Sequence, residues 1–427
     1  MQQSSSSIQK QYLCIDLKSF FASVECVERG LDPWTTKLVV ADNERSDTTI
    51  CLAVTPAMKA MGVKSRCRLY EIPQNIDFIK APPRMKKYIE YSAEVYGVYL
   101  KYISKDDIHI YSIDEVFIDA TKYLRLYKTD ALGLSKKIIK DVYETTGIPA
   151  ACGIGTNLYL AKIALDITAK KSPEHIGVLD EESYIKTLWD HKPITDFWHI
   201  GRGTANTLAG YGIYTMKDVA HYPQDTLYRK FGVNAEILID HAWGREPTTI
   251  ADIKNYKTKS HSFSSGQILP RDYNYEEGLL IAKEMAEQLC MDIFDKDVTA
   301  RSMTLEVVYG GRERDSDRGT YKFVSPTNAV SEIINGTTRL YEKITDRKRG
   351  VRKITVCFNN AEKDVCEQLD FFSDTVGKER EKTRMKAING IRKRYGKNSI
   401  FKGRDLEDCA TARERNRQIG GHKSGEK

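Results

Sequence analysis

Alternation between apolar and polar residues predicts the elements of the first part of the chain. An apolar strand at YLCID passes into a helix near Phe20, and KLVVAD indicates a second short strand. TPAMKAMGV is typical of a helix that ends at Gly62. In RMKKYIEYSAEVYGVYLKYI the helical period places four apolar positions near one face, which are Ile89, Val95, Val98 and Tyr102.

The next segments complete an α/β pattern. DIHIYSIDEVFIDA has two alternating halves and predicts a β-hairpin. It is followed by the helix ALGLSKKIIKDVYETTG, the strand PAACGIGT and the helix NLYLAKIALDIT. We therefore predict one α/β domain that ends near residue 175, and short helices with glycine-containing turns over 180–245. IADIKNYKTKSHSFSSG is polar and poor in strand signals, which indicates a linker.

A second α/β pattern follows the predicted linker. Its segments are the helix EEGLLIAKEMAEQLCMDIF, the strand SMTLEVVYG, the helix NAVSEIINGTTRLYEKI and the strand VRKITVCFNNA. Beyond about residue 361 the chain is charged and only partly periodic. The fold class is therefore α/β (α+β), with at least two separate domains.

Composition changes this picture little. The chain has 427 residues, of which 41% are hydrophobic and 29% charged, the profile of a soluble globular protein. No apolar run approaches the roughly 20 residues that a membrane helix needs. The N-terminal MQQSSSSIQK has no signal-peptide pattern, so we expect a short disordered leader and a cytoplasmic protein.

Cysteine spacing and charge restrict the chemistry. The nine cysteines occur singly, with no CxxC pair, which argues against structural zinc and against a disulfide framework. The net charge of +7 suits a phosphate-rich partner, although many solvated surfaces have a similar balance.

Three acids stand at predicted strand ends. Asp114 and Glu115 occupy SIDE, which the hairpin pattern puts in the connection between strands, and Asp16 ends the first strand. Carboxylates brought together in this way are typical ligands of a pair of Mg²⁺ ions that serve phosphoryl transfer. The alternative is a solvated turn acid together with a helix N-cap at Asp16, and spacing alone leaves both interpretations open.

At these residues the chain resembles a known family. DLKSFFASVE together with YSIDE resembles the Y-family translesion DNA polymerases, in their bacterial UmuC-like branch. The resemblance continues through GIGTNLYLAKIA and WHIGRGTANTLAGYGI. It implies a right-hand polymerase with palm, small fingers, helical thumb and little finger. The implied ranges are palm 1–19 and 84–175, fingers 20–83, thumb 176–250, linker 251–258, little finger 259–360 and tail 361–427.

The resemblance also implies roles for individual residues. Asp16, Asp114 and Glu115 are implied as catalytic ligands of two Mg²⁺ ions, with the main-chain carbonyl of Leu17 as a further ligand. Many relatives have a second acid where this chain has Lys18. The implied contacts to the nucleotide triphosphate come from Ser19, Phe20, Phe21, Lys59 and Lys170. Lys171 leaves the last assignment open by one residue, and Pro56 replaces a tyrosine that contacts phosphate in some relatives.

Two further features have both a functional and an ordinary interpretation. Phe21 is by default a core residue early in a helix, whereas the resemblance makes it a steric gate against the 2′-OH of a ribonucleotide. WHIGRGTANTLAGYGI resembles a helix–hairpin–helix, in which Gly201 and Gly203 permit a tight turn whose backbone N–H groups bind a DNA phosphate.

The tail contains a possible partner-binding peptide, QLDFF. It resembles the peptide with which bacterial polymerases bind the sliding clamp, through Gln368, Leu369, Asp370, Phe371 and Phe372. The alternative is a short packed strand end.

The predicted function is low-fidelity DNA synthesis past damaged bases, without proofreading, because the remaining tail is too short for an exonuclease domain. The expected partners are primer–template DNA, deoxynucleoside triphosphates and the sliding clamp. Some UmuC-like enzymes also require accessory SOS proteins or a recombinase filament. The alternatives are a nucleotidyl cyclase, and a catalytically inactive repair scaffold that binds DNA and clamp.

Overall fold

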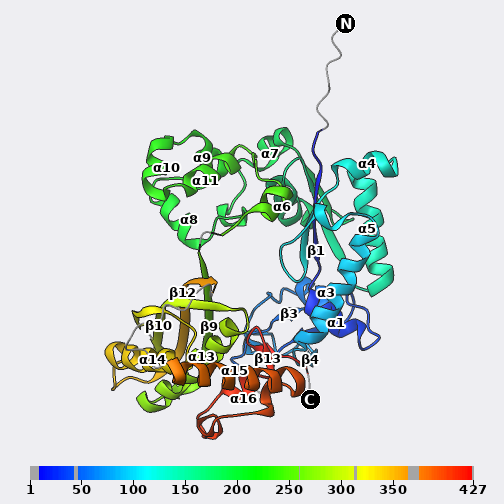
Figure 1. Ribbon diagram of the computed structural model, residues 1–427. Helices are drawn as coiled ribbons and strands as arrows, with labels where there is room; N and C mark the ends of the chain where they lie inside the picture. The colour runs from blue at the N-terminus through cyan, green and yellow to red at the C-terminus, as the bar shows by residue number, and fades with distance from the viewer. Residues whose placement is uncertain (1–8, 43–46, 259, 312–314, 364–374, 426–427) are drawn as a thin grey trace. The chain divides into compact units, whose positions relative to one another are not determined.

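The computed structural model describes residues 9–42, 47–258, 260–311, 315–363 and 375–425 (Figure 1). The chain divides into two compact units, the first with residues 1–256 and 423–427 and the second with residues 257–422. In the part of the chain that is described, no helix is both long and apolar enough to cross a bilayer.

A five-stranded sheet forms the centre of the first unit, in the order β5-β6-β1-β7-β8. Its strands are β1 (Tyr12–Leu17), β5 (Ile108–Ile110), β6 (Glu115–Asp119), β7 (Ala150–Gly155) and β8 (Ile176–Leu179). β1 pairs antiparallel with both β6 and β7, whereas β7 and β8 run parallel. The predicted hairpin is confirmed as β5 and β6, although Glu115 is the first residue of β6 and not part of the connection.

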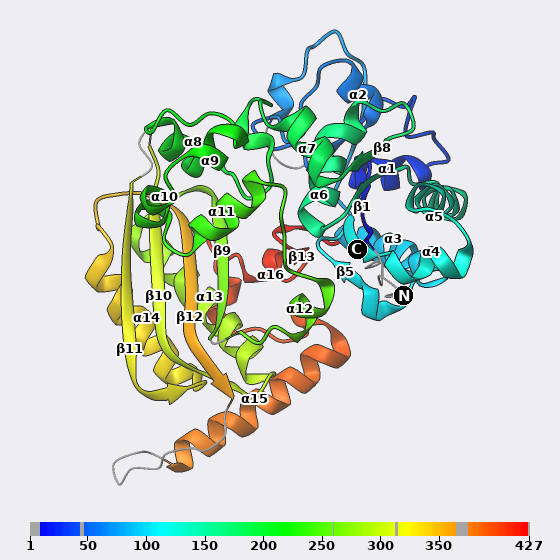
Figure 2. The same ribbon diagram turned by 90° about the horizontal axis from the view of Figure 1, so that it is seen from above.

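Alternation along β1 assigns each face of this sheet to different helices. Leu13, Ile15 and Leu17 join the main core, while Tyr12 and Cys14 face the opposite side. The main core includes residues of α1 (Phe20–Val27), α3 (Met85–Leu100), α4 (Thr121–Tyr127) and α5 (Ala131–Thr146). On the other face lies α6 (Leu158–Ile163), and Figures 1 and 2 show α6 and α5 on opposite sides of β1.

Helix α3 buries a different stripe from the expected one. Val95 and Val98 are buried as expected, but Ile89 is 46% exposed and Tyr88 is completely buried in its place. The buried stripe therefore begins one residue earlier than predicted. The prediction missed Tyr88 because a hydrophobicity count gives a tyrosine less weight than an isoleucine, although its ring fills more of the core.

Two glycines allow α6 to lie close to the sheet. A Cβ at Gly153 or Gly155 would overlap the backbone of α6 at Ala161. The helix continues as a π-helix, η3 (Ala164–Thr168), a form that is frequent near functional sites. The GIG sequence thus fixes how near α6 comes to β1.

A small three-stranded sheet, in the order β3-β2-β4, has its own core on one face, whereas its other face joins the main core through Leu38, Val40, Ala53 and Ala81. Its elements are β2 (Leu38–Val40), β3 (Ala53–Val54), β4 (Ile79–Ala81) and the helix α2 (Pro56–Ala60). As predicted from TPAMKAMGV, α2 is followed by Gly62, which has a left-handed φ of 87°.

Short helices form the rest of the first unit, and the first five of them share one core. They are α7 (Glu181–Leu188), α8 (Arg202–Ala209), α9 (Met216–His221), α10 (Gln224–Phe231), α11 (Asn234–Ala242) and α12 (Ile250–Asn255). Helix α12 lies within the predicted linker, which is therefore shorter than expected. Ile250 and Ile253 pack α12 against the sheet face that carries Tyr12.

The second unit is a four-stranded antiparallel sheet in the order β11-β10-β12-β9. Its strands are β9 (His261–Tyr273), β10 (Val298–Tyr309), β11 (Ser316–Thr327) and β12 (Val351–Lys363). Helices α13 (Tyr275–Phe294) and α14 (Val330–Ile344) pack on the sheet and form its core. The pattern of apolar positions predicted both helices and strands β10 and β12, but it did not locate β9 and β11.

The described part of the segment after β12, predicted as a tail, packs on the second unit. In α15 (Thr375–Tyr395), Met385 is buried in the core of this unit. Glu381 accepts hydrogen bonds from Ser331 of α14, and Thr411 N donates to the buried Glu284 of α13. The remaining short elements are η1 (Leu69–Glu71), η2 (Lys105–Asp107), η4 (Ala169–Lys171), η5 (Ile194–Asp196), η6 (Lys397–Ser399), η7 (Gly403–Leu406), α16 (Ala412–Arg415), β13 (Gln418–Ile419) and β14 (His422–Lys423).

Candidate active site

The three acids meet at one end of the five-stranded sheet. Asp16 and Glu115 are direct cross-strand partners in the β1–β6 register. Asp114 immediately precedes β6, and its carbonyl accepts a hydrogen bond from Leu17 N at 2.9 Å. Cross-strand partners have Cβ atoms about 4.5–5.5 Å apart, so two residues that are 99 positions apart (115 − 16) share one site.

Helix α6 contributes a lysine to this cluster. Lys162 Nζ lies 2.8 Å from Glu115 Oε1 and 3.1 Å from Asp166. Cys14 Sγ donates to the same Glu115 oxygen at 3.2 Å. Lys162 is only 8% exposed, so this ion pair is sheltered from water.

Burial and like charge act together on Asp16. Burial, followed by the charges of Asp114 and Glu115, raises the pKa of Asp16 to about 7, while Lys162 opposes the shift. Neighbouring carboxylates repel one another once they are ionised, and a bound divalent metal ion would offset that repulsion.

The donor set fits Mg²⁺, which takes carboxylate and carbonyl oxygens. Among the described residues, no three acidic, histidine or cysteine side chains are already arranged to hold a metal ion. Glu115 is bonded to Lys162, and Asp114 accepts from the hydroxyl of Ser112 at 2.6 Å. A metal ion would draw on the carboxylate oxygens that these hydrogen bonds now occupy.

Lysines lie close to the acids as well. Burial is the largest cause that lowers the pKa of Lys18, and the charges of Lys59 and Lys170 lower it further. Burial and Lys170 also lower the pKa of Lys59, against the charges of Asp16 and Asp114. The structure thus brings together Lys59 and Lys170, both expected, and adds Lys18; nothing is described of the Lys171 side chain. Mutually repelling ammonium groups are suited to a highly charged anion.

Helix α1 begins at Phe20, close in sequence to Asp16. Ser19 is the N-cap residue with a left-handed φ of 50°, and its buried hydroxyl has no hydrogen-bond partner among the described residues. The first N–H groups of a helix lack intrahelical acceptors and attract anions. Phe20 is buried in the core, so only its backbone is available to a ligand, whereas Phe21 is half-buried.

Gly201 and Gly203 lie at the start of α8, and their binding of a DNA phosphate stays a prediction. Neither has a positive φ; the left-handed residue of this turn is His199, at 68°. Gly201 is the N-cap of α8 and Gly203 lies inside that helix, and a Cβ at either position would meet no atom within 4 Å. The two glycines therefore leave the surface of α8 open at its start, so that the backbone of another molecule can approach it closely.

The clamp-peptide residues Gln368, Leu369, Asp370, Phe371 and Phe372 lie outside the described residues, and their role stays a prediction.

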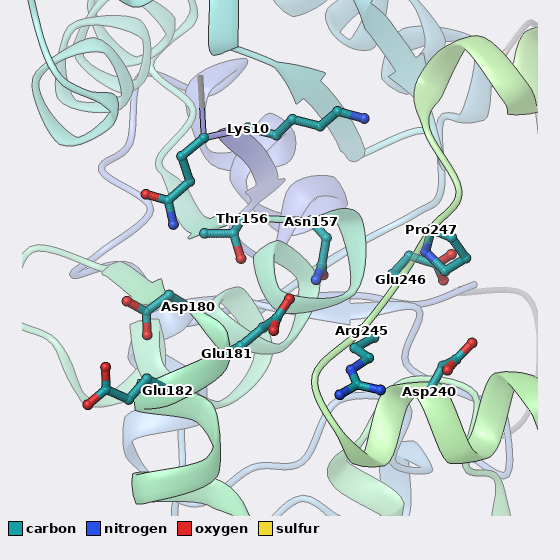
Figure 3. Close-up of a pocket in the computed structure, with 11 residues that line it drawn as sticks. Lys10, Thr156, Asn157, Asp180, Glu181, Glu182, Asp240, Arg245, Glu246 and Pro247 are labelled. Carbon is teal, nitrogen blue, oxygen red and sulfur yellow. The ribbon is translucent and has the colours of Figure 1, made fainter. Parts of the chain in front are cut away.

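An acidic hollow of about 720 Å³ lies elsewhere on the first unit (Figure 3). Thr156 and Asn157 line it, just beyond the end of β7 that pairs with Tyr12. Because Asp16 pairs with Ala151, five residues before Thr156, the hollow lies about 17 Å along the strand from the acids. It is therefore separate from the catalytic cluster.

Lys162 and Tyr88 were not singled out in the sequence, and Lys18 was noted only as standing where many relatives have an acid. The segment LAKIA fits a helical pattern, but nothing in it indicates a chemical role for its lysine, Lys162. The short spacing between GIG and Lys162 is the available clue, since glycines in a strand indicate close approach of a neighbouring backbone.

The fold and the acid cluster define a class of nucleotidyl-transfer enzyme, and comparison with known proteins gives the family. Residues 15–166 match the sequence model of the impB/mucB/samB family, and residues 260–371 match the C-terminal domain of that family. The structure resembles a Y-family DNA polymerase chimera, Dbh-Dpo4(243-245)-Dbh, with a TM-score of 0.65 and 21% identity, over 82% of this chain and 98% of that one.

Relatives cover nearly the whole chain. The putative UV-damage repair protein UvrX of Bacillus subtilis (strain 168) is 32% identical over 97% of this chain and 98% of its own length. DNA polymerase IV 2 of the same organism is 29% identical over 97% and 99%. The chain belongs to this family, the UmuC-like branch of the Y-family DNA polymerases, which confirms the resemblance seen in DLKSFFASVE and YSIDE.

Proposed function

We propose that this enzyme extends primers on DNA templates, including templates with damaged bases, by a two-metal nucleotidyl transfer. The observation that carries the proposal is the cluster of Asp16, Asp114 and Glu115, with lysines grouped beside it. UvrX is named for UV-damage repair and other relatives for DNA polymerase IV, which supports damaged DNA as the substrate.

The subdomains of a right-hand polymerase follow from this proposal. The five-stranded sheet is the palm (1–19 and 84–175), with its edge strand β8 just beyond residue 175, and the three-stranded sheet belongs to the fingers (20–83). The short helices of residues 176–250 form the thumb, and the sheet of the second unit is the little finger. The core of the second unit, and the core on one face of the three-stranded sheet, support these divisions.

Asp16, Asp114, Glu115 and the Leu17 carbonyl are the proposed ligands of two Mg²⁺ ions. Bound there, the ions would supply Lewis-acid stabilisation of the attacking and leaving oxygens. The chain's own residues orient these ligands: Lys162 holds Glu115 at 2.8 Å, and Ser112 holds Asp114.

The nucleotide lies between the acids and the lysines in this proposal. Lys59 and Lys170 neutralise the triphosphate, and the backbone N–H groups of Ser19, Phe20 and Phe21 face it. The partnerless hydroxyl of Ser19 supports a polar ligand at this place. Phe21 then lies beneath the sugar as the steric gate.

We further propose that synthesis is of low fidelity and without proofreading, and that the sliding clamp recruits the enzyme through residues 368–372. The backbone at Gly201 and Gly203 binds a phosphate of the DNA, which the open surface there supports.

Primer extension with Mg²⁺ tests the proposal, on an undamaged template and on one with a single lesion. Asp114→Asn should reduce nucleotide addition to no more than a few per cent of the wild-type rate, because it removes a shared ligand. It should leave duplex binding intact. A wild-type protein that binds duplex but adds no nucleotide would be the inactive scaffold. A primer with a mismatched 3′ end should be extended and not shortened.

A further inference from the structure

We propose that Tyr88 is a specificity-determining residue, which fixes the ring of Phe21 against the sugar of the incoming nucleotide. The inference rests on the proposed function of Phe21 as the steric gate. It adds that the gate is a pair of rings, the second of which is buried and held by an ion-pair network.

The two rings are stacked. Their centroids are 4.5 Å apart and their planes are inclined by 16°. Tyr88 lies on α3 and is completely buried, whereas Phe21 lies on α1 and is half-buried. The buried ring thus supports the more exposed one from behind, so that a ligand pressing on Phe21 meets a surface that does not yield.

The hydroxyl of Tyr88 is bonded to a buried carboxylate. It donates to Glu25 Oε1 at 2.8 Å, and Glu25 is completely buried on α1. The bond joins the helix of the gate to the helix that supports it. Rotation of the Tyr88 ring would break this bond inside the core, where water cannot replace it.

Glu25 is held by two arginines in addition. Arg84 donates from Nε to Oε1 and from Nη2 to Oε2, both at 2.9 Å, and Arg29 donates to Oε2. Burial would raise the pKa of Glu25, but the hydrogen bonds from Arg84, Arg29 and Tyr88 outweigh it, so the pKa is lowered. A two-pronged arginine contact fixes a carboxylate in direction as well as in position.

Arg84 is itself confined. Gly425, which belongs to the same unit, packs against it so closely that a Cβ there would lie 2.9 Å from Arg84 Cβ. Lys86 N, two residues further along, donates to the carbonyl of Ser424 at 3.0 Å. The network behind Phe21 is therefore fixed at each step from Arg84 to the stacked rings.

The test compares kcat/KM for a ribonucleotide with that for its deoxy partner. Tyr88→Met keeps most of the volume and removes the flat ring, so the preference for the deoxy sugar should fall about two- to tenfold, the factor that a stacked aromatic pair supplies. Tyr88→Phe keeps the ring and loses only the hydroxyl bond to Glu25, so its sugar preference should lie between those of wild type and Tyr88→Met. A thermal melt establishes that each variant is folded.

Tyr123→Leu is the matched control. Tyr123 is also a buried tyrosine, and its hydroxyl bonds to Asp107, but it lies on α4. It should lower stability and leave the sugar preference unchanged. If Tyr88→Met does not fold, Glu25→Gln, which loosens the ring without removing it, should lower the preference by a smaller factor.

Phe21→Ala separates the two hypotheses. By removing the gate it should reduce the preference about ten- to two-hundredfold, the size of a steric penalty for one heavy atom. An unchanged preference would reject the gate, and the proposed role of Phe21 with it. If Phe21→Ala relaxes the preference and Tyr88→Met does not, the role of Tyr88 is overturned. In the double variant, Tyr88→Met should have no further effect, because the ring it positions is gone.

Discussion

At the scale of single residues, the acids of the site are in conflict with the stability of the protein. Asp16 lies beside two other carboxylates in a buried place, and its pKa is raised to about 7. The charge of Lys162 opposes that shift without cancelling it. Active sites commonly sacrifice stability for function in this way, so the acids should lower the free energy of unfolding of the metal-free protein.

We therefore expect Asp16→Asn to stabilise the metal-free protein while it abolishes nucleotide addition. A carboxyl whose pKa is raised on folding destabilises the folded state above that pKa, and the effect is lost once both states are protonated. The gain should be of the order of 1–4 kcal/mol at pH 8 and should vanish towards pH 4. Urea unfolding in EDTA at several pH values measures it.

Asp77→Asn, at an exposed position, is the control and should change little. Addition of Mg²⁺ should stabilise the wild type more than Asp16→Asn. A variant that is less stable than wild type at pH 8 would contradict this account.

At the scale of elements, the approach of α6 to the sheet positions the site. Gly153 and Gly155 leave room for the backbone at Ala161, and this proximity brings Lys162 to Glu115. The contact depends on a distance between elements, and not only on the residues that form the ion pair.

Gly153→Ala should thus displace α6 and lower both stability and activity. Overpacking of this kind costs about 1–3 kcal/mol, and separation of Lys162 from Glu115 should reduce kcat more than KM. Gly97→Ala on α3 is the control, since a Cβ there meets nothing within 4 Å, and it should be stabilising by about 0.5–1 kcal/mol. Equal effects of the two substitutions on kcat would contradict the role of the close approach.

A second prediction at this scale concerns residues 368–372. Replacement of Gln368, Leu369 and Phe372 by alanine should leave synthesis on short primers unchanged and remove stimulation by the sliding clamp. The reason is that the amide and the apolar anchors of an extended peptide carry most of its affinity. Clamp stimulation of equal size in wild type and variant would count against this interpretation.

What the sequence reveals depends on how local each feature is. The β5–β6 hairpin follows from alternation within fourteen residues, from Asp107 to Ala120, and was predicted. The Lys162–Glu115 pair joins residues 47 apart (162 − 115) in sequence, and only the closeness of α6 explains it. Strand β11 was missed because its solvent face carries polar and charged residues, so its apolar face alone gives a weak signal.

At the scale of the whole molecule, the two units have separate hydrophobic cores. The proposed metal and nucleotide ligands all belong to the first unit. Units with their own cores commonly unfold as separate cooperative steps.

Calorimetry should accordingly record two transitions, and Mg²⁺ with a deoxynucleoside triphosphate should raise the temperature of only one. At ligand concentrations about a hundred times Kd, the gain is about 2.7 kcal/mol. Asp114→Asn should lose this shift while retaining both transitions. A single transition that moves as a whole would show that the units are not independent.

The folding of α15 onto the second unit has a consequence for recruitment to the clamp. Because β12 ends at Lys363 and α15 begins at Thr375, the proposed clamp peptide lies between two elements of the second unit and not at a chain end. Eleven residues span at most about 39 Å, so a loop with both ends tethered reaches outward by only about half of that. If the peptide binds the clamp as proposed, the enzyme is tethered at a short distance from the clamp. Its orientation on DNA is restricted accordingly, in exchange for a high effective concentration at the primer end.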